Sequence, residues 1–242
     1  NNGADGDVGW LASDGILGDD CYLCYGKETE EIFEDCLWEI HIQGQYSALR
    51  EYKEAVMAWE KNFSSKGEKS FSAASKVENN LSKNGFLSSV AELTKDSLDH
   101  LHAAAVNERR LNDKLMQTKI GKVITFGDVI QLRHVKSKKF LTVSYYQLAE
   151  QERENMRVTV ERCGNALSGV CLHPRFKHDK EGQAILNNSE VMIRIHEKPT
   201  EYIHATNKLM YSSMCSAFSK DEVNCSLDFT VWTVCLYRKA VV

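Results

Sequence analysis

The sequence contains an internal repeat, and this repeat limits the possible folds more than any other feature of the chain. Residues 127–134 (GDVIQLRH) align without a gap with residues 189–196 (SEVMIRIH), which lie 62 positions further on. The same spacing places residues 140–143 on residues 202–205, and in both copies a polar turn separates two apolar segments. Such turns between short apolar segments are typical of strand–turn–strand units. We therefore expect a mainly β fold built from repeated units.

Weaker signals extend the repeat to three copies. An earlier copy begins near residue 6, with the sequence GDVGWL. Each copy is followed by an apolar strand: residues 35–40 and 228–234 both carry a central Trp, and residues 170–173 form the middle example. Three multi-strand copies favour a closed threefold barrel, a β-trefoil, because closure removes exposed strand edges. An ordinary sandwich that contains two similar hairpins is the alternative.

Residues 46–118 do not follow the strand pattern and predict two helices. The first helix covers residues 46–59, and its apolar face holds Leu49, Tyr52, Val56 and Trp59. The second helix covers residues 88–117, and the stripe expected on it consists of Leu98, Leu101, Ala105, Leu111 and Leu115. Both segments are dense in residues that favour helices.

The segment between the two helices, residues 62–84, is rich in Ser, Lys and Asn and predicts a flexible loop. We therefore expect a single domain over residues 1–242. Its β-trefoil head comprises residues 1–45 and 119–242, and a helix-turn-helix arm, residues 46–118, is inserted between the first and second copies.

Charge and hydropathy exclude several classes of partner. The net charge is −4 and the pI is about 6.1, so the chain lacks the basic excess of a nucleic-acid-binding protein. Its longest apolar stretches, such as residues 231–237, are too short to span a bilayer. The polar, acidic start does not resemble a signal peptide. We expect neither nucleic-acid binding nor direct membrane contact.

Eight cysteines and several Asn-x-Ser sequons raise the question of a secreted protein. The sequons begin at Asn62, Asn80, Asn187 and Asn224. However, a chain of 242 residues does not need disulfides to hold its core. Cys36, Cys171 and Cys235 also lie in apolar strand patterns, where free cysteine behaves as a small hydrophobe. We expect a reducing compartment and unused sequons.

The sequence shows no constellation of catalytic residues. It has no Gly-rich phosphate loop, no nucleophile elbow and no zinc-protease helix motif. Cys21 and Cys24 have metal-site spacing but no second pair of ligands nearby. His100 and His102 are two apart on a helix and point in different directions. We therefore predict no enzymatic activity, no cofactor and no bound metal.

Two basic groups are candidates for recognition. Lys136, Lys138 and Lys139 share one turn, and the loop around Phe176 carries a second group made of Arg175, Lys177, His178 and Lys180. Solvated charge, docking onto an acidic neighbouring domain and phosphate binding are all consistent with such groups. We favour docking.

The amino-acid sequence of the second copy resembles sequences of a known family. Residues 127–143 are similar to the opening segment of the second trefoil copy in inositol trisphosphate receptors. The other segments that match in order are residues 33–38, 46–48, 101–104, 155–160 and 223–225, together with Trp232. The resemblance runs from residue 6 to residue 237. Ryanodine receptors share the same amino-terminal domain arrangement, but their amino-acid sequences are less similar to this one.

The resemblance implies the amino-terminal suppressor domain of such a channel. In the family this domain precedes the ligand-binding core, lowers the affinity of that core and couples ligand binding to gating. It lies on the cytosolic face of the endoplasmic reticulum in a homotetramer. Because the family places the inositol trisphosphate site in the following domains, we expect no binding of that ligand by this chain alone.

The resemblance also implies the residues of two interfaces. The residues expected at the interface with the ligand-binding core are Ile16, Leu17, Asp19, Lys136 and Lys138. The loop that carries Phe176 is expected to reach a neighbouring subunit. The chain departs from the family at Glu34, where an arginine is usual, and at Phe176, where a tyrosine is usual.

Two alternative functions follow from the expected trefoil. Carbohydrate-binding trefoils of the ricin type usually carry a Gln-x-Trp triplet near the end of each copy, and this sequence has none. Trefoil modules that accompany protein mannosyltransferases lie in the endoplasmic reticulum lumen. That role would require oxidised cysteines and used sequons, and it would not explain a helical arm.

Overall fold

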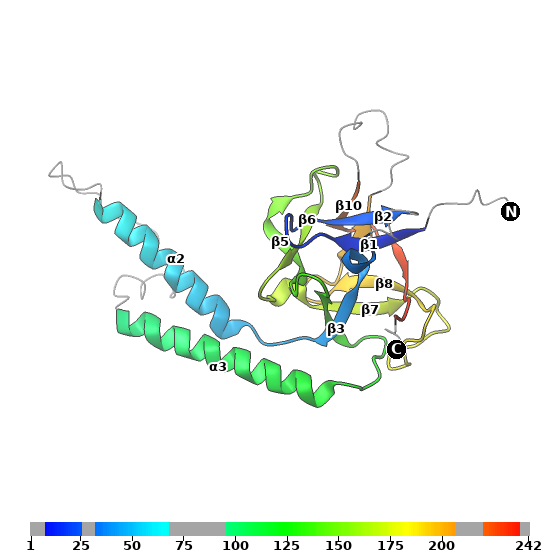
Figure 1. Ribbon diagram of the computed structural model, residues 1–242, viewed down its shortest axis with the longest axis horizontal. Helices are drawn as coiled ribbons and strands as arrows, with labels where there is room; N and C mark the ends of the chain where they lie inside the picture. The colour runs from blue at the N-terminus through cyan, green and yellow to red at the C-terminus, as the bar shows by residue number, and fades with distance from the viewer. Residues whose placement is uncertain (1–7, 26–31, 68–94, 207–219, 238–242) are drawn as a thin grey trace. The chain divides into compact units, whose positions relative to one another are not determined.

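The chain divides into a β unit, Asn1–Gly44 with Lys119–Val242, and a helical unit, Gln45–Thr118. The computed structural model describes residues 8–25, 32–67, 95–206 and 220–237. Its strands, labelled in Figure 1, are β1 (Gly9–Ser13), β2 (Cys21–Tyr25), β3 (Trp38–Ile42), β4 (Val129–His134), β5 (Phe140–Leu148), β6 (Met156–Glu161), β7 (Val170–Pro174), β8 (Glu190–Ile195), β9 (Tyr202–Ala205), β10 (Asp221–Ser226) and β11 (Val231–Thr233). Short 3-10 helices cover Phe33–Cys36 and Ala166–Ser168, and the long helices are α2 (Ser47–Gly67) and α3 (Lys95–Lys119). The expectation of a mainly β fold with helices is confirmed.

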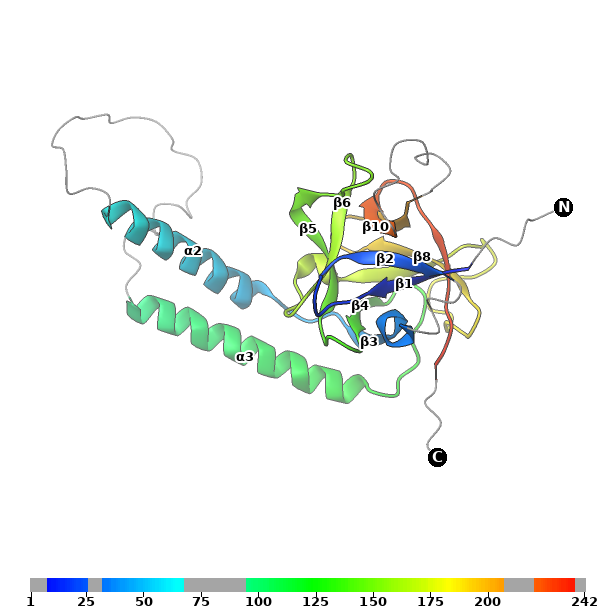
Figure 2. The same ribbon diagram turned by 45° about the horizontal axis from the view of Figure 1, so that its top comes forward.

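The sheet of the β unit closes on itself. Its strands are hydrogen-bonded in the order β10-β6-β5-β4-β7-β8, and β9 pairs with both β8 and β10. The β1–β2 hairpin joins this circuit through β10, while β3 pairs with β4 and β11 pairs with β8. Figure 2 shows these strands wrapped around a common interior. The largest fully buried side chains there include Ile130, Leu141, Leu167, Ile195 and Ile203.

The two clearest copies of the repeat are real, but their gapless alignment is wrong by one residue in the first strand. Val135 N donates to Leu37 O, and the equivalent bond runs from His196 N to Gly169 O. This sets an offset of 61, which places buried Ile130 on buried Val191. Leu141 and Ile203, in the second strands, keep the offset of 62. The turn of the later copy is thus one residue longer. A gapless alignment would exchange the core and outer faces of the strand.

The tryptophans of β3 and β11, Trp38 and Trp232, have equivalent structural roles in their respective copies. Trp38 Nε1 donates to Leu11 O over 2.9 Å, and Trp232 Nε1 donates to Ile203 O over 3.1 Å. Both rings pack against the main hydrophobic core. Each indole therefore fills the core while its one polar group is satisfied by a backbone carbonyl.

The helical unit is held together at the start of α2 by polar side chains of α3. Glu108 accepts hydrogen bonds from Ser47 Oγ and from the backbone N–H groups of Ala48 and Leu49, over 2.9–3.1 Å. Asn112 accepts from Gln45 N and donates to Gln45 O. Backbone N–H groups in the first turn of a helix lack partners within that helix. A carboxylate from the neighbouring helix therefore caps α2.

Two details of the predicted helices need correction. Leu111 and Leu115 are 51% and 40% exposed, because Glu108 and Asn112 follow Ala105 at the three- and four-residue spacing that defines the inner face. Helix α2 runs on to Gly67, so the predicted loop begins inside a helix. The rest of that loop and the predicted start of α3, residues 68–94, lie outside the described residues.

Replacing Glu108 with Ala should destabilise the helical unit. Loss of the cap leaves the first N–H groups of α2 without their carboxylate, and we expect the free energy of unfolding to fall by about 1–2 kcal/mol. Urea denaturation followed by circular dichroism measures this change. Asp113→Ala, at an exposed position on the same helix, is the control. Equal stability of the two variants would contradict the capping role.

Candidate functional site

The turn between β1 and β2, residues 14–20, presents two large apolar side chains to solvent. Leu17 is 95% exposed and Ile16 is 62% exposed. Isolated exposed apolar residues are common, so exposure alone does not identify a site. What distinguishes this segment, called the 14–20 turn below, is how firmly its backbone is held.

The amino-terminal half of the 14–20 turn is fixed by local geometry. Asp14 Oδ2 accepts a hydrogen bond from Leu17 N over 3.1 Å. Gly15 has a φ of +65°, and a Cβ atom there would lie 2.4 Å from Ser137 Oγ and 2.9 Å from His134 Nδ1. Only glycine combines this left-handed conformation with so close an approach. The turn is thus packed directly against the β4–β5 turn.

Lys136 bridges the 14–20 turn to the 3-10 helix Phe33–Cys36. Its Nζ lies 2.7 Å from Asp35 Oδ1 and 3.5 Å from Asp14 Oδ1. The Asp35 side chain is only 7% exposed, so this carboxylate depends on the ammonium for compensation. The hydrogen bond to Asp35 raises the pKa of Lys136 above its ordinary value. The ammonium group of Lys136 is therefore used in ion pairs within this chain, and these pairs hold the 14–20 turn in place.

Two further ion pairs hold the carboxy-terminal half of the turn. Asp19 Oδ1 lies 2.5 Å from Lys139 Nζ, and Asp19 O accepts from Val160 N over 2.7 Å. The Asp20 carboxylate receives two bonds of 2.6 Å from the Arg157 guanidinium. Such bidentate pairs fix geometry as well as adding energy. The exposed leucine is consequently carried on a turn that is anchored at both ends.

Lys138, which follows in the β4–β5 turn, has a different neighbour. It adopts a φ of +58°, and its Nζ lies 3.3 Å from Glu39 Oε1 on β3. Arg133 and His41 also contact Glu39, each over 3.4 Å. Burial raises the pKa of Glu39, but the hydrogen bonds from Lys138 and His41 bring it below its ordinary value. Ile16, Leu17, Asp19 and Lys136 thus lie in one surface region. The side chain of Lys138 points instead toward β3.

His134 supports this region from beneath, and sequence reasoning missed it. The ring is fully buried, with Nε2 3.1 Å from Asp35 O and Nδ1 2.9 Å from Ser137 Oγ. A carbonyl can only accept, so Nε2 carries the proton and Nδ1 accepts from the serine hydroxyl. Burial lowers the pKa of His134. The neutral ring therefore links three segments of the chain, and no sequence signal distinguished it from an ordinary strand residue.

The second candidate segment is the loop between β7 and β8. Phe176 is 44% exposed, its ring stacks on His178 at 5.4 Å, and the Arg175 guanidinium lies 5.1 Å from its centroid. Arg175 also forms a 2.6 Å ion pair with Glu190. The loop thus presents a partly exposed aromatic ring that contacts two basic side chains.

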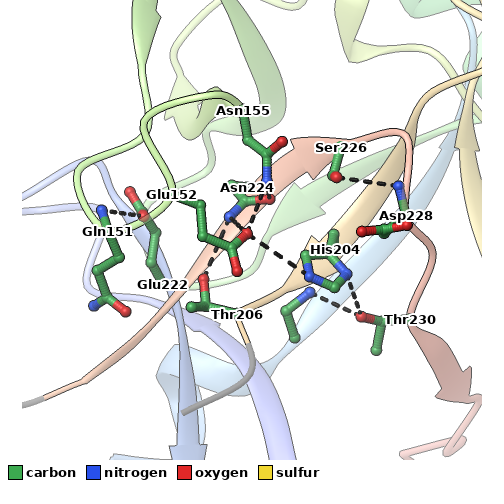
Figure 3. A network of polar contacts seen from close by, with 11 residues as sticks. Gln151, Glu152, Asn155, His204, Thr206, Glu222, Asn224, Ser226, Asp228 and Thr230 are labelled. Atoms are coloured by element: carbon green, nitrogen blue, oxygen red, sulfur yellow. Dashed lines mark hydrogen bonds and ion pairs between the residues drawn. The ribbon is translucent and has the colours of Figure 1, made fainter. Parts of the chain in front are cut away.

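A polar network, also missed from the sequence, fixes the loop between β5 and β6 (Figure 3). Glu152 Oε2 accepts from Asn155 Nδ2 and Asn224 Nδ2 over 2.7 and 2.8 Å, and the Glu222 carboxylate accepts two backbone N–H groups of the loop. His204 lies 3.8 Å from Glu152. Asn224 is fully buried, so a glycan cannot be attached to the folded chain there. The network is satisfied within the protein, as a structural network requires.

The cysteines do not form a metal or disulfide site in the described part of the chain. Cys21 belongs to the main core and Cys24 to a small second cluster with Cys36, because residues three apart on a strand point to opposite faces. None of the described cysteines forms a disulfide, and burial raises the pKa of Cys36 to about 12. Residues 8–25, 32–67, 95–206 and 220–237 hold no group of three or more potential metal ligands. None of their helices is long and apolar enough to span a bilayer.

Comparison with known proteins identifies the family. Residues 2–241 match the family described as inositol 1,4,5-trisphosphate/ryanodine receptor. The chain belongs to this family. Among its curated relatives is the inositol 1,4,5-trisphosphate receptor itr-1 of Caenorhabditis elegans, 33% identical over 145 residues. That match covers 59% of this chain and 5% of the relative, so it spans only a small part of that receptor.

Membership of the inositol 1,4,5-trisphosphate/ryanodine receptor family confirms the resemblance drawn from residues 127–143. It speaks against the two trefoil alternatives, carbohydrate binding and a mannosyltransferase module. The buried sequon at Asn224 also speaks against the lumenal alternative.

Replacing Gly15 with Ala should loosen the 14–20 turn. An alanine at this φ costs about 1–2 kcal/mol, and the added methyl group would also press on Ser137. Hydrogen exchange at the Leu17 amide should accelerate. Gly18→Ala is a matched control in the same turn, because nothing lies within 4 Å of a Cβ at that position. Similar exchange in both variants would show that the turn is not held as described.

Proposed function

We propose that the chain is the amino-terminal regulatory domain of an intracellular ligand-gated calcium release channel. It lies on the cytosolic face of the endoplasmic reticulum, precedes the ligand-binding core, lowers the affinity of that core and couples ligand binding to gating. The family match and the receptor named among the relatives support this role. The domain acts through contacts and performs no catalysis.

The finer architecture that we propose is a β-trefoil head with a helix-turn-helix arm. The closed circuit of strands, the equivalent backbone hydrogen bonds of the two copies and the equivalent tryptophans Trp38 and Trp232 support the trefoil. Helices α2 and α3 come between β3 and β4 in the chain, which agrees with an insertion between the first and second copies.

The observation that carries the proposal is the combination of exposure and anchoring at Leu17. An apolar side chain in water is unfavourable by itself, and burying it against a partner recovers about 25 cal/mol per Å². Because Asp14, Gly15 and Lys136 already fix the backbone, little further ordering is needed on docking. Ile16 and Leu17 therefore suit insertion into an apolar depression on the ligand-binding core.

Charged groups around the turn set the orientation of that contact. The carboxylate of Asp19 is 56% exposed and the Lys138 side chain is 51% exposed, so both can face a partner while they keep their internal pairs. Rim charges of this kind affect specificity and association rate more than affinity. In the tetramer that we propose, the exposed ring of Phe176 contacts a neighbouring subunit.

Suppression of ligand affinity is then a coupling free energy: docking of this domain favours an arrangement of the ligand-binding core that binds the ligand less tightly. Such couplings are typically about 1–3 kcal/mol, or roughly 5- to 150-fold in affinity. To test this, the chain is joined to its own ligand-binding core, and inositol trisphosphate affinity is compared with that of the core alone. The core alone should bind more tightly by a factor within that range.

Variants of the joined protein localise the effect. Leu17→Ala should recover part of the affinity without changing the melting temperature, because Leu17 contributes nothing to the core of this domain. Leu227→Ala removes a side chain that is 72% exposed elsewhere and is the matched control. Equal affinity with and without the domain would end the suppressor proposal.

The domain alone should not bind inositol trisphosphate tightly. Lys136, Lys139 and Arg175 from the two basic groups form ion pairs within the chain, so they do not offer free charge to a trisphosphate. Isothermal titration calorimetry should detect no binding at micromolar concentrations. Affinity of about −8 kcal/mol or better would place a ligand site in this domain.

A further inference from the structure

Ser137 lies in the β4–β5 turn within the most basic stretch of the chain. The sequence around it is RHVKSKK, and the cationic residues near it are Arg133, Lys136, Lys138 and Lys139. Ser137 is partly exposed, and its neighbours Lys136 and Lys138 are both exposed. Protein kinases select substrates partly through the charge pattern around the acceptor hydroxyl. The pattern here matches a kinase with an acidic substrate groove.

The contacts of Ser137 connect it to the anchoring of the 14–20 turn. Its hydroxyl is bonded to His134 Nδ1 over 2.9 Å. A Cβ on Gly15 would lie 2.4 Å from Ser137 Oγ and 2.7 Å from Ser137 Cβ, so no space for additional atoms exists between the two turns. Lys136 and Lys139, on either side, provide the cations that hold Asp14, Asp35 and Asp19.

We propose that Ser137 is a phosphorylation site for a serine/threonine kinase that recognises basic sequences, and that its phosphorylation releases the 14–20 turn. This inference rests on the proposed docking role of that turn. In the reaction, Ser137 Oγ forms a bond to the γ-phosphorus of ATP while the bond from that phosphorus to the β,γ-bridging oxygen breaks. ADP leaves, and the hydroxyl proton passes to the base of the kinase.

The product differs from serine in charge and in size. A phosphoserine carries about −1.5 to −2 charges at neutral pH and three acceptor oxygens. It would compete with Asp14 and Asp35 for Lys136 and with Asp19 for Lys139. Its volume would also displace Gly15 from its position against Ser137. Both effects detach the turn that carries Leu17, so docking would lose its pre-ordered surface.

Ser189 provides an internal comparison. It lies in the turn before β8 and is partly exposed like Ser137, and its hydroxyl accepts from Leu186 N. Its neighbours in the chain are Asn188 and Glu190 instead of lysines. A kinase that selects basic flanks should therefore modify Ser137 and leave Ser189 unmodified.

The test begins with the 242-residue chain, a purified kinase that prefers basic sequences, and ATP with magnesium. Peptide mass spectrometry should locate one phosphoryl group on Ser137, and Ser137→Ala should abolish it. Hydrogen exchange is then measured at the amides of Leu17, bonded to Asp14, and Val160, bonded to Asp19. Exchange should accelerate about tenfold or more on phosphorylation, as expected when a charge-assisted contact is lost.

Two results would overturn the proposal. One is no transfer to Ser137 in the folded chain when a free peptide of residues 131–141 is phosphorylated under the same conditions. The other is transfer to Ser137 with unchanged exchange at both amides. If transfer and loosening occur but neither phosphorylation nor Leu17→Ala changes the affinity of the joined ligand-binding core, the switch stands and the docking function fails.

Discussion

Strand β9 pairs with β8 on one edge and with β10 on the other, and this double pairing closes the sheet. Closure leaves the core strands without free edges and brings segments that are distant in sequence to one surface. The β1–β2 hairpin joins the closed sheet because β2 pairs with β10. The turn of this hairpin packs against the turn between β4 and β5, where Gly15 lies next to Ser137. The candidate site exists because these two turns, more than a hundred residues apart in the chain, are held in contact.

Charge pairing is the second layer of this arrangement. Three cations form ion pairs with aspartates in or beside the 14–20 turn. Lys136 pairs with Asp14 and Asp35, Lys139 with Asp19, and Arg157 with Asp20. Individual surface pairs contribute little to stability, but here several of them act on one short segment and the partner of Lys136, Asp35, is buried. Their combined effect is to order a turn whose own apolar side chains face water. A region stabilised mainly by charge is also one that a new charge can disturb, which is the basis of the inference on Ser137.

The two polar systems of the β unit serve different ends. The network around Glu152 centres on the fully buried Asn224 and is satisfied within the protein, and it fixes the β5–β6 loop onto β10 (Figure 3). The groups around Lys136 and Lys138 lie at the surface and remain partly exposed. The first arrangement suits structural specificity, and the second suits a contact that must form and dissociate.

The sequence by itself determined the mainly β fold, the presence of two helices and the family, because strand periodicity, helix periodicity and the similarity of residues 127–143 to the family are local properties. It also placed Ile16 and Leu17 on an exposed turn, since glycines and acids surround them. Only the tertiary structure decided the register of the repeat, where one extra turn residue shifts every side chain to the other face. It alone showed that Lys136 pairs with Asp35, that His134 links three segments, and that Glu108 caps a helix from outside it. Each of these contacts joins residues far apart in the chain, and no local pattern records which distant partner a polar side chain will meet.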